Sequence, residues 1–283
     1  MLEKVENLSE IASAGQVLTS SQLASWEKNG FLVLKGFFDE DVLKAYDEEV
    51  NLLMHNRATM AGDITIDVLE GHLTGQRLKL KDAPDVALES AHKINDLFLE
   101  SPKCRDLNLA PKLCQGLEDI LGDKPLIINS LTFRKGSQQP HHFDTYFMPP
   151  PVQNMMAVTS ICLEDQSPEV GILSYYPGSH KIPPYVFSHG SIAANMEEMD
   201  KATEFAMTEI KKLGLKEETF TGKAGDVFIW HSQLYHGGLQ IEDHSKTRKT
   251  LVTHYWRKQD VDQSRVATAE NGGHYMTREH QSA

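Results

Sequence analysis

His142 and Asp144 are separated by one residue, and His236 follows 92 residues after Asp144. Two histidines and one carboxylate are the ligand set of the facial triad, which holds non-haem Fe(II) and leaves coordination positions open for a cosubstrate and oxygen. Arg248 comes twelve residues after His236, and a guanidinium can bind a carboxylate through two parallel hydrogen bonds. These four residues together predict a metal-dependent, oxygen-activating enzyme.

The geometry of a β-strand predicts which neighbouring histidines could join this site. Alternate side chains of a strand share one face, so His142 and Asp144 would point the same way and His141 the other way. His231 and His236 are five residues apart, so only one of them can reach the site from a single extended strand. The triplet alone is a weak signal, because a chain with 13 histidines also offers hydrogen-bonded His–Asp pairs on loops.

Size and composition describe an ordinary globular protein. A β-rich chain of 283 residues can form one domain, here expected over residues 1–283, and 40% hydrophobic with 24% charged residues is typical of a packed fold. The net charge of −12 argues against nucleic-acid and membrane-surface partners but allows a small-molecule substrate bound in a local basic pocket. The sequence predicts a cytoplasmic protein. Its cysteines show no paired spacing, it has no apolar signal core, and it has no apolar run of roughly 20 residues. The oligomeric state is left open.

The first part of the chain predicts helical supports and a lid over about residues 18–125. Apolar residues recur at the spacing of a helical face, and glycines interrupt the pattern. The expected elements are helices over residues 20–26, 39–53 and 86–121, a short strand over 31–34, and a polar, irregular lid over 55–82.

From about residue 126 the pattern changes to short β-like runs bounded by turn residues. These runs cover residues 126–128, 131–133, 155–162, 171–176, 227–230 and 250–256. They predict a mainly β fold with flanking helices, whose core is a double-stranded β-helix of jelly-roll, cupin-like type over about 126–258. A partly helical insertion is expected over 188–222, with its helix over 196–215, and a flexible tail over 262–283.

Five segments resemble, in order, the phytanoyl-CoA dioxygenase family of Fe(II)/2-oxoglutarate-dependent oxygenases. They are GFLVLKGFF at 30–38, GSQQPHHFD at 136–144, GILSYYPGSH at 171–180, GDVFIWHSQLYHG at 225–237 and RKTLVTHY at 248–255. Each match is modest by itself. The ordered set, which spans residues 18–256 with its flanks, is specific.

The resemblance implies that His142, Asp144 and His236 are the iron ligands and the catalytic centre. It places Arg248 on the distal carboxylate of 2-oxoglutarate, with Gln139 and Thr132 as further cosubstrate contacts. The implied cofactors are Fe(II), 2-oxoglutarate and O2, with ascorbate as a supporting reductant. Retention of Asp144 favours hydroxylation, since halogenating relatives lack this carboxylate. Lys249 is the rival cation, but on a strand it would face the opposite side from Arg248.

The substrate is the least determined feature. Polar and aromatic residues flank the expected site, and they favour a small zwitterion: Asn129, Arg134, Thr145, Tyr146, Tyr255 and Arg257. The pattern is similar to that of bacterial hydroxylases of 2-aminoethylphosphonate or its trimethylated form, which oxidise the carbon next to phosphorus. Ectoine-like or acyl-CoA substrates are the alternatives. A zinc hydrolase and a non-catalytic metal-binding β-scaffold are alternatives of other classes.

Overall fold

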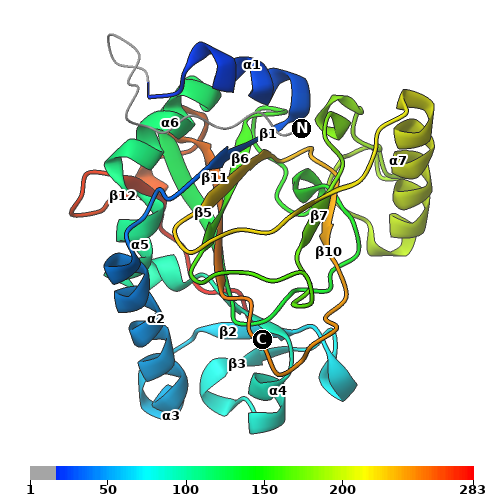
Figure 1. Ribbon diagram of the computed structural model, residues 1–283. Coiled ribbons are helices and arrows are strands. Elements are labelled where there is room, and N and C mark those ends of the chain that lie inside the picture. Colours follow the sequence, from blue (N-terminus) through cyan, green and yellow to red (C-terminus); the bar gives the residue numbers. More distant parts are fainter. Residues whose placement is uncertain (1–16) are drawn as a thin grey trace.

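The computed structural model describes residues 17–283 and contains two β-sheets that face each other (Figure 1). The large sheet has the strand order β1-β9-β6-β11-β5-β4-β2-β3, and the small sheet has the order β10-β7-β8. Their strands are β1 (Phe31–Leu34), β2 (Thr65–Val68), β3 (Arg77–Lys79), β4 (His92–Asn95), β5 (Pro125–Phe133), β6 (Met156–Cys162), β7 (Leu173–Tyr175), β8 (Glu218–Phe220), β9 (Val227–His231), β10 (His236–Gly238) and β11 (Thr250–Arg257). This arrangement is the predicted jelly-roll core, and β1, β5, β6, β7, β9 and β11 fall on the expected runs, whereas β2, β3, β4, β8 and β10 were not expected.

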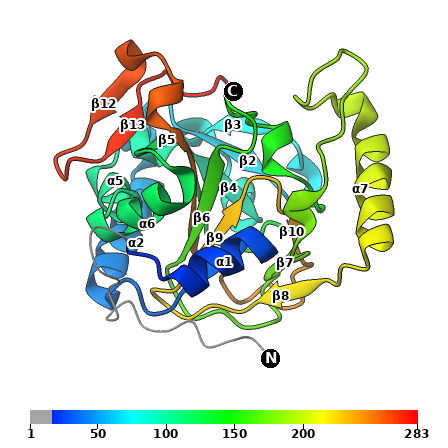
Figure 2. The ribbon, with the colours of Figure 1, turned by 90° about the horizontal axis from the view of Figure 1, so that it is seen from above.

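Helices cover the outer face of the large sheet, and one helix lies on the far side of the molecule (Figures 1 and 2). They are α1 (Ser20–Asn29), α2 (Glu40–His55), α3 (Arg57–Met60), α4 (Asp85–Glu89), α5 (Pro102–Asn108), α6 (Pro111–Leu121) and α7 (Met199–Leu213). No helix in residues 17–283 combines the length and the apolar character that a membrane crossing needs. Helix α7 corresponds to the expected insertion and packs through Ala202, Ala206 and Ile210 against Phe143 and Tyr146, next to the predicted ligands.

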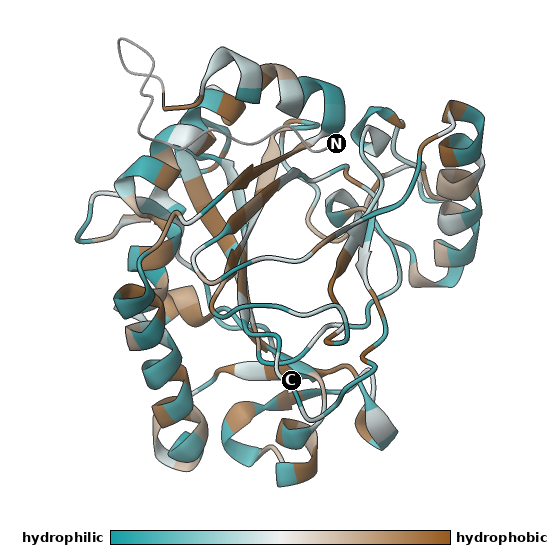
Figure 3. Ribbon diagram, viewed as in Figure 1, coloured by the Kyte–Doolittle hydropathy of each residue, from teal (hydrophilic) through white to brown (hydrophobic). Residues whose placement is uncertain are grey.

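Side-chain alternation along the central strands separates a core from a cavity. On β11, Leu251 and Tyr255 belong to the main core between the sheet and its helices. Thr250, Val252 and His254 point to the opposite face, which lines a cavity between the two sheets. The apolar colouring of the central strands in Figure 3 reflects burial on both faces, because a second apolar cluster lies between the two sheets.

The first helix ends as its sequence predicts, and its last turn meets the strand end that precedes the third ligand. Thr19 and Gln22 form a capping box at its start, and Gly30 closes it with φ 79°. A Cβ on Gly30 would lie 2.4 Å from His180 Nδ1, so this position needs glycine for space as well as for backbone conformation. The Gly30 carbonyl accepts a hydrogen bond from His231 N–H, which ties α1 to the end of β9.

Three segments differ from their sequence-based expectations. The segment 55–82 contains β2 and β3, and the stretch 86–121 contains β4, so both extend the large sheet where a lid and a helix were expected. These strands are only three or four residues long, so they carry too little periodic signal to be recognised. The segment 262–283 was expected to be flexible, but it forms β12 (Val266–Thr268) and β13 (His274–Met276), and β13 pairs in parallel with β5.

Candidate active site

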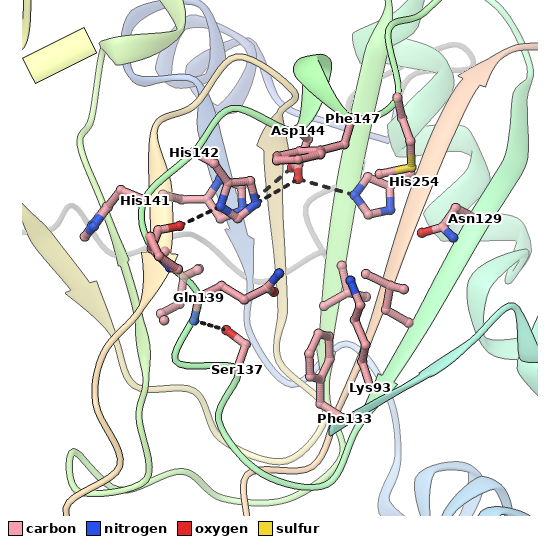
Figure 4. A pocket seen from close by; sticks show the side chains of 18 of the residues that line it. Lys93, Asn129, Phe133, Ser137, Gln139, His141, His142, Asp144, Phe147 and His254 are labelled. Carbon is pink, nitrogen blue, oxygen red and sulfur yellow. Dashed lines mark hydrogen bonds and ion pairs between the residues drawn. The ribbon is translucent and has the colours of Figure 1, made fainter. Parts of the chain in front are cut away.

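A single backbone bridge joins the two histidines of the predicted triad. His142 N–H donates to the carbonyl of His236 at 2.8 Å, and His236 N–H donates to that of His142 at 3.1 Å. Asp144 then begins a short 3-10 turn, Asp144–Tyr146, which turns its carboxylate toward both rings. One ligand atom from each of the three side chains lies within 4.8 Å of the others. Figure 4 shows His142 and Asp144 of this cluster side by side. The backbone bridge and the 3-10 turn thus bring the three side chains together, a role that was expected from alternation along a continuous strand.

Backbone carbonyls orient both imidazole rings. The Nδ1 of His142 bonds to the carbonyl of Pro140 at 2.8 Å, and the Nδ1 of His236 bonds to that of Leu234 at 2.9 Å. Because a carbonyl can only accept, each Nδ1 carries the proton and each Nε2 is left with its lone pair. The Nε2 atoms lie 3.5 and 3.7 Å from the Asp144 oxygens. This is the arrangement in which histidine binds a metal ion.

Trp230 holds the Asp144 carboxylate, and His254 lies against it. The indole Nε1–H of Trp230 donates to Asp144 Oδ2 at 2.8 Å, and His254 Nε2 lies 3.5 Å from Oδ1. Burial raises the pKa of Asp144, but the surrounding imidazoles outweigh burial and hold its pKa well below the usual value. Burial lowers the pKa of His236 to about 4. At neutral pH the site therefore offers an ionised carboxylate beside a neutral imidazole.

A cavity of about 600 Å³ opens from the three ligands along the inner face of the large sheet. Arg248 lines this cavity, is 6% exposed, and makes no ion pair with any of residues 17–283. Its Nε has no hydrogen-bond partner among the described residues, and burial lowers its pKa to about 10, so the guanidinium stays charged at neutral pH. Lys249 faces the other side of the sheet, where it pairs with Asp47 at 2.7 Å.

Two more residues proposed from sequence lie in the cavity wall. Gln139 and Asn129 both line it, and Figure 4 shows Gln139 on the side of the ligand loop and Asn129 on the side of the large sheet. Thr132 does not line the cavity, because on β5 it has the opposite orientation from Leu131 and Phe133. Its hydroxyl instead bonds to Tyr46 OH at 2.6 Å, in the helix-side core.

The remaining substrate candidates also point away from the cavity, which corrects the expectation that they face it. Arg134 pairs with Asp47 of α2 at 3.3 Å, and Tyr255 OH donates to the Asn108 carbonyl in the helix-side core. Thr145 and Tyr146 are buried in the turn after Asp144, where the Tyr146 hydroxyl accepts from Tyr185 N–H. Arg257 pairs with Asp260 at 2.7 Å. Adjacency in sequence to the triad misled the prediction at these positions.

Several cavity residues were missed by the sequence reasoning. His254 could have been found, because it lies six residues after Arg248 and therefore shares its face of the strand. Lys93 and Arg77 reach the cavity from β4 and β3, which were not expected as strands. Met199 of α7 and Gln281 near the C-terminus also line it, and no local sequence pattern indicates these long-range placements.

The comparisons with known proteins agree with this geometry. The family model described as phytanoyl-CoA dioxygenase (PhyH) matches residues 26–249. The chain is 27% identical over 233 residues to an ectoine dioxygenase of Bordetella bronchiseptica (strain ATCC BAA-588 / NCTC 13252 / RB50), covering 78% of this chain and 70% of the relative. It is 21% identical over 251 residues to the peroxisomal phytanoyl-CoA dioxygenase of Rattus norvegicus, covering 84% of this chain and 68% of that one.

Solved structures share the fold at lower identity. The non-haem α-ketoglutarate-dependent carbocyclase SnoK from nogalamycin biosynthesis superposes with a TM-score of 0.67 at 16% identity, covering 96% of this chain and 99% of SnoK. EctD from S. alaskensis, crystallised with 2-oxoglutarate and 5-hydroxyectoine, gives a TM-score of 0.62 at 17% identity, covering 90% and 82%. At such identities the likeness concerns the fold.

Proposed function

Because the chain belongs to the phytanoyl-CoA dioxygenase (PhyH) family, we propose that it is an Fe(II)- and 2-oxoglutarate-dependent oxygenase that hydroxylates a C–H bond of a small polar molecule. One observation carries the proposal. The two-histidine, one-carboxylate cluster and the unpaired guanidinium of Arg248 open onto the same cavity. A metal site alone would not need a buried cation beside it.

The donor set fits Fe(II). His142, Asp144 and His236 would supply three ligands and leave the remaining positions open toward the cavity, as facial-triad iron requires. Both ring orientations are fixed by backbone carbonyls, so the ligands need little rearrangement to receive the ion. Trp230 fixes the carboxylate in the same way. A zinc hydrolase could use these ligands too, but it gives no reason for Arg248.

The cavity also fits a dicarboxylate. Arg248 is a buried charge without an ion-pair partner in residues 17–283, and such a charge is costly unless an anion accompanies it. Lys93 and Arg77 line the same cavity and share the carboxylate of Asp67, at 3.3 and 2.6 Å. Two cations share this one carboxylate, while Asp200 of α7 is a separate carboxylate in the cavity wall, so Lys93 and Arg77 can also contact an anionic group of a bound molecule.

Iron with 2-oxoglutarate and oxygen would supply the oxidising power that inserts a hydroxyl group into a C–H bond. The chain's own residues provide position and shielding. Trp230 holds Asp144, His254 lies against it, and Arg248 would orient the cosubstrate. The Phe147 ring packs edge-on against His142 at 5.5 Å and, with Met148, lines the cavity beside the ligands. These apolar side chains limit the access of water to the reacting groups.

For the substrate we propose a small zwitterion, with 2-aminoethylphosphonate or an N-methylated form as the first candidate and oxidation next to phosphorus. The position of Asn129 in the cavity wall and the presence of the cations Lys93 and Arg77 support this choice. Arg134 and Tyr255 no longer support it, since they face the helices. Ectoine is the second candidate, because a curated relative that the chain matches over most of its length is an ectoine dioxygenase.

The test is 2-oxoglutarate-dependent formation of succinate by the purified protein with Fe(II), ascorbate and each candidate. We expect turnover that requires iron and is abolished in Asp144→Ala, whose matched control is Asp243→Ala on an exposed loop. Hydrolytic activity with zinc would identify the metallohydrolase alternative instead. Absence of both activities, with metal still bound, would identify a non-catalytic scaffold and refute the proposal.

A further inference from the structure

Asp96 is a buried carboxylate that holds two amide side chains in the cavity wall. It is fully buried and adopts a left-handed backbone conformation with φ 60°, directly after β4. Asn129 Nδ2 donates to its Oδ1 at 2.9 Å, and Gln281 Nε2 donates to its Oδ2 at 3.2 Å. Asn129 comes from β5 and Gln281 from the C-terminal segment 277–283, so Asp96 joins two distant parts of the chain.

These hydrogen bonds determine which end of each amide is left for a ligand. A carboxylate only accepts, so it fixes the nitrogen end of both amides against Asp96. Both side chains line the cavity. The Asn129 oxygen has no hydrogen-bond partner, and the Gln281 oxygen makes no hydrogen bond within residues 17–283. The wall therefore offers two amide oxygens, which can accept hydrogen bonds but cannot donate them.

The C-terminal segment 277–283 is anchored to the sheet by more than this contact. Arg278 Nη2 pairs with Asp96 Oδ2 at 2.6 Å, and its guanidinium also donates to the carbonyl of Ile128 at 3.4 Å. Ile128 is the residue left without a partner by the irregularity in the pairing of β5 with β11. His280 Nε2 lies 3.0 Å from Glu100 Oε1. These contacts bring Gln281 to the cavity.

The pair of oxygens lies on the side of the iron ligands. Asn129 is the register partner of His254, which in turn lies 3.5 Å from Asp144. The cations Lys93 and Arg77 lie on a different row of the sheet, because Lys93 pairs with Phe133, four residues along β5 from Asn129. At about 3.3 Å per residue this is a separation of roughly 13 Å along the strand. One cavity thus holds the two acceptors near the ligands, beside the neutralised Arg278–Asp96 pair, and the cations Lys93 and Arg77 farther along the sheet.

We propose that Asn129 and Gln281 form a subsite for a substrate nitrogen that carries N–H groups, and that Asp96 and Arg278 hold this subsite together. The inference rests on the proposed function and deepens it by choosing among its substrates. A primary or secondary ammonium, or a protonated ring nitrogen, satisfies both oxygens. A trimethylated nitrogen has no N–H and leaves them unpaired, which costs affinity. The subsite therefore selects 2-aminoethylphosphonate or ectoine over the trimethylated form.

The test uses the anaerobic enzyme with Fe(II) and 2-oxoglutarate, and follows the visible charge-transfer band as probes are added. The probes are ectoine and two matched pairs: 2-aminoethylphosphonate with its trimethylated form, and ethanolamine with choline. We expect at least one N–H compound to perturb the band, and each trimethylated partner to bind about tenfold or more weakly. Absence of the band in the wild-type protein would refute the proposed function itself.

Variants separate the subsite from general stability. Gln281→Ala should weaken the N–H probe about tenfold and leave the trimethylated probe and the band without probe unchanged, whereas the exposed neighbour Glu279→Ala should change nothing. Arg278→Ala should weaken the same probe, and Arg278→Lys should restore part of the loss. The proposal is overturned if a trimethylated probe binds as tightly as its partner, if no N–H probe perturbs the band, or if Gln281→Ala leaves affinity unchanged.

Discussion

Replacing Arg248 by methionine should stabilise the metal-free protein and remove its affinity for 2-oxoglutarate. The guanidinium is buried, makes no ion pair within residues 17–283 and has no partner for its Nε. A buried charge of this kind destabilises the fold until an anion binds beside it. Methionine fills a similar volume without the charge, so stability and binding should change in opposite directions.

The pKa of Arg248 gives the size of the effect. Burial lowers it from 12.5 to about 10, and at about 1.4 kcal/mol for each pH unit the charged form is disfavoured by roughly 3 kcal/mol. Loss of the remaining polar interactions of the guanidinium offsets part of this gain. We therefore expect Arg248→Met to raise the free energy of unfolding by about 1 to 3 kcal/mol. For a chain of this size that is a rise in Tm of roughly 2 to 4 °C per kcal/mol.

Thermal unfolding with and without 2-oxoglutarate, in the presence of a redox-inert divalent metal, measures both changes. Wild-type protein should gain about 2.7 kcal/mol at a cosubstrate concentration of a hundred times Kd, and Arg248→Met should gain nothing. Lys249→Met is the matched control, because Lys249 pairs with Asp47 on the outer face. It should lose stability slightly and keep the cosubstrate effect. Destabilisation of Arg248→Met, or a retained response to 2-oxoglutarate, would refute the reasoning.

Three further perturbations test other parts of the site. In Gly237→Ala the new Cβ would lie 2.8 Å from the Gln139 carbonyl oxygen, so the backbone bridge between the two histidine ligands should open. The free energy of unfolding should fall by about 1 to 3 kcal/mol, and metal analysis should show lower iron occupancy. His254→Ala should weaken Fe(II) binding about tenfold in a titration, whereas Tyr255→Phe should leave it unchanged. Burial lowers the pKa of His231 to about 4, so at weakly acidic pH this imidazole is protonated in the unfolded chain but neutral in the folded chain. The free energy of unfolding, measured with urea, should therefore fall as the pH drops from about 6.5 to 4. It should fall less steeply in His231→Gln.

Local sequence patterns were sufficient for the parts of the fold with strong periodicity. The helix over 40–55 and the apolar strands over 125–133 and 250–257 follow from side-chain spacing, because one face of each is buried in the helix-side core. The strands β2, β3 and β4 at one end of the large sheet were not predicted. Their stability comes from partners across the sheet, such as the Arg77–Asp67 ion pair, and such partners leave no local signal.

The candidate ligands were predictable because the chemistry of iron restricts residue types and the ordered motifs restrict positions. The substrate wall was not predictable in this way. Residues close to the triad in sequence, such as Arg134 and Thr145, turned out to face other parts of the structure. Gln281, which lies 45 residues after His236, reaches the cavity because β13 pairs with β5 and Arg278 binds Asp96. Long-range pairing of this kind determines which residues line the cavity wall, and the spacing of residues in the sequence does not reveal it.

The most direct test of the central claim is an anaerobic titration of Fe(II) into the protein with 2-oxoglutarate, followed by visible absorption. The structure predicts a charge-transfer band that saturates at one iron per chain, is lost in His236→Ala, and is strongly weakened in Arg248→Met. Exposure to oxygen with a substrate should then release succinate in proportion. A protein that binds iron at this triad but gives neither the band nor succinate would contradict the assignment.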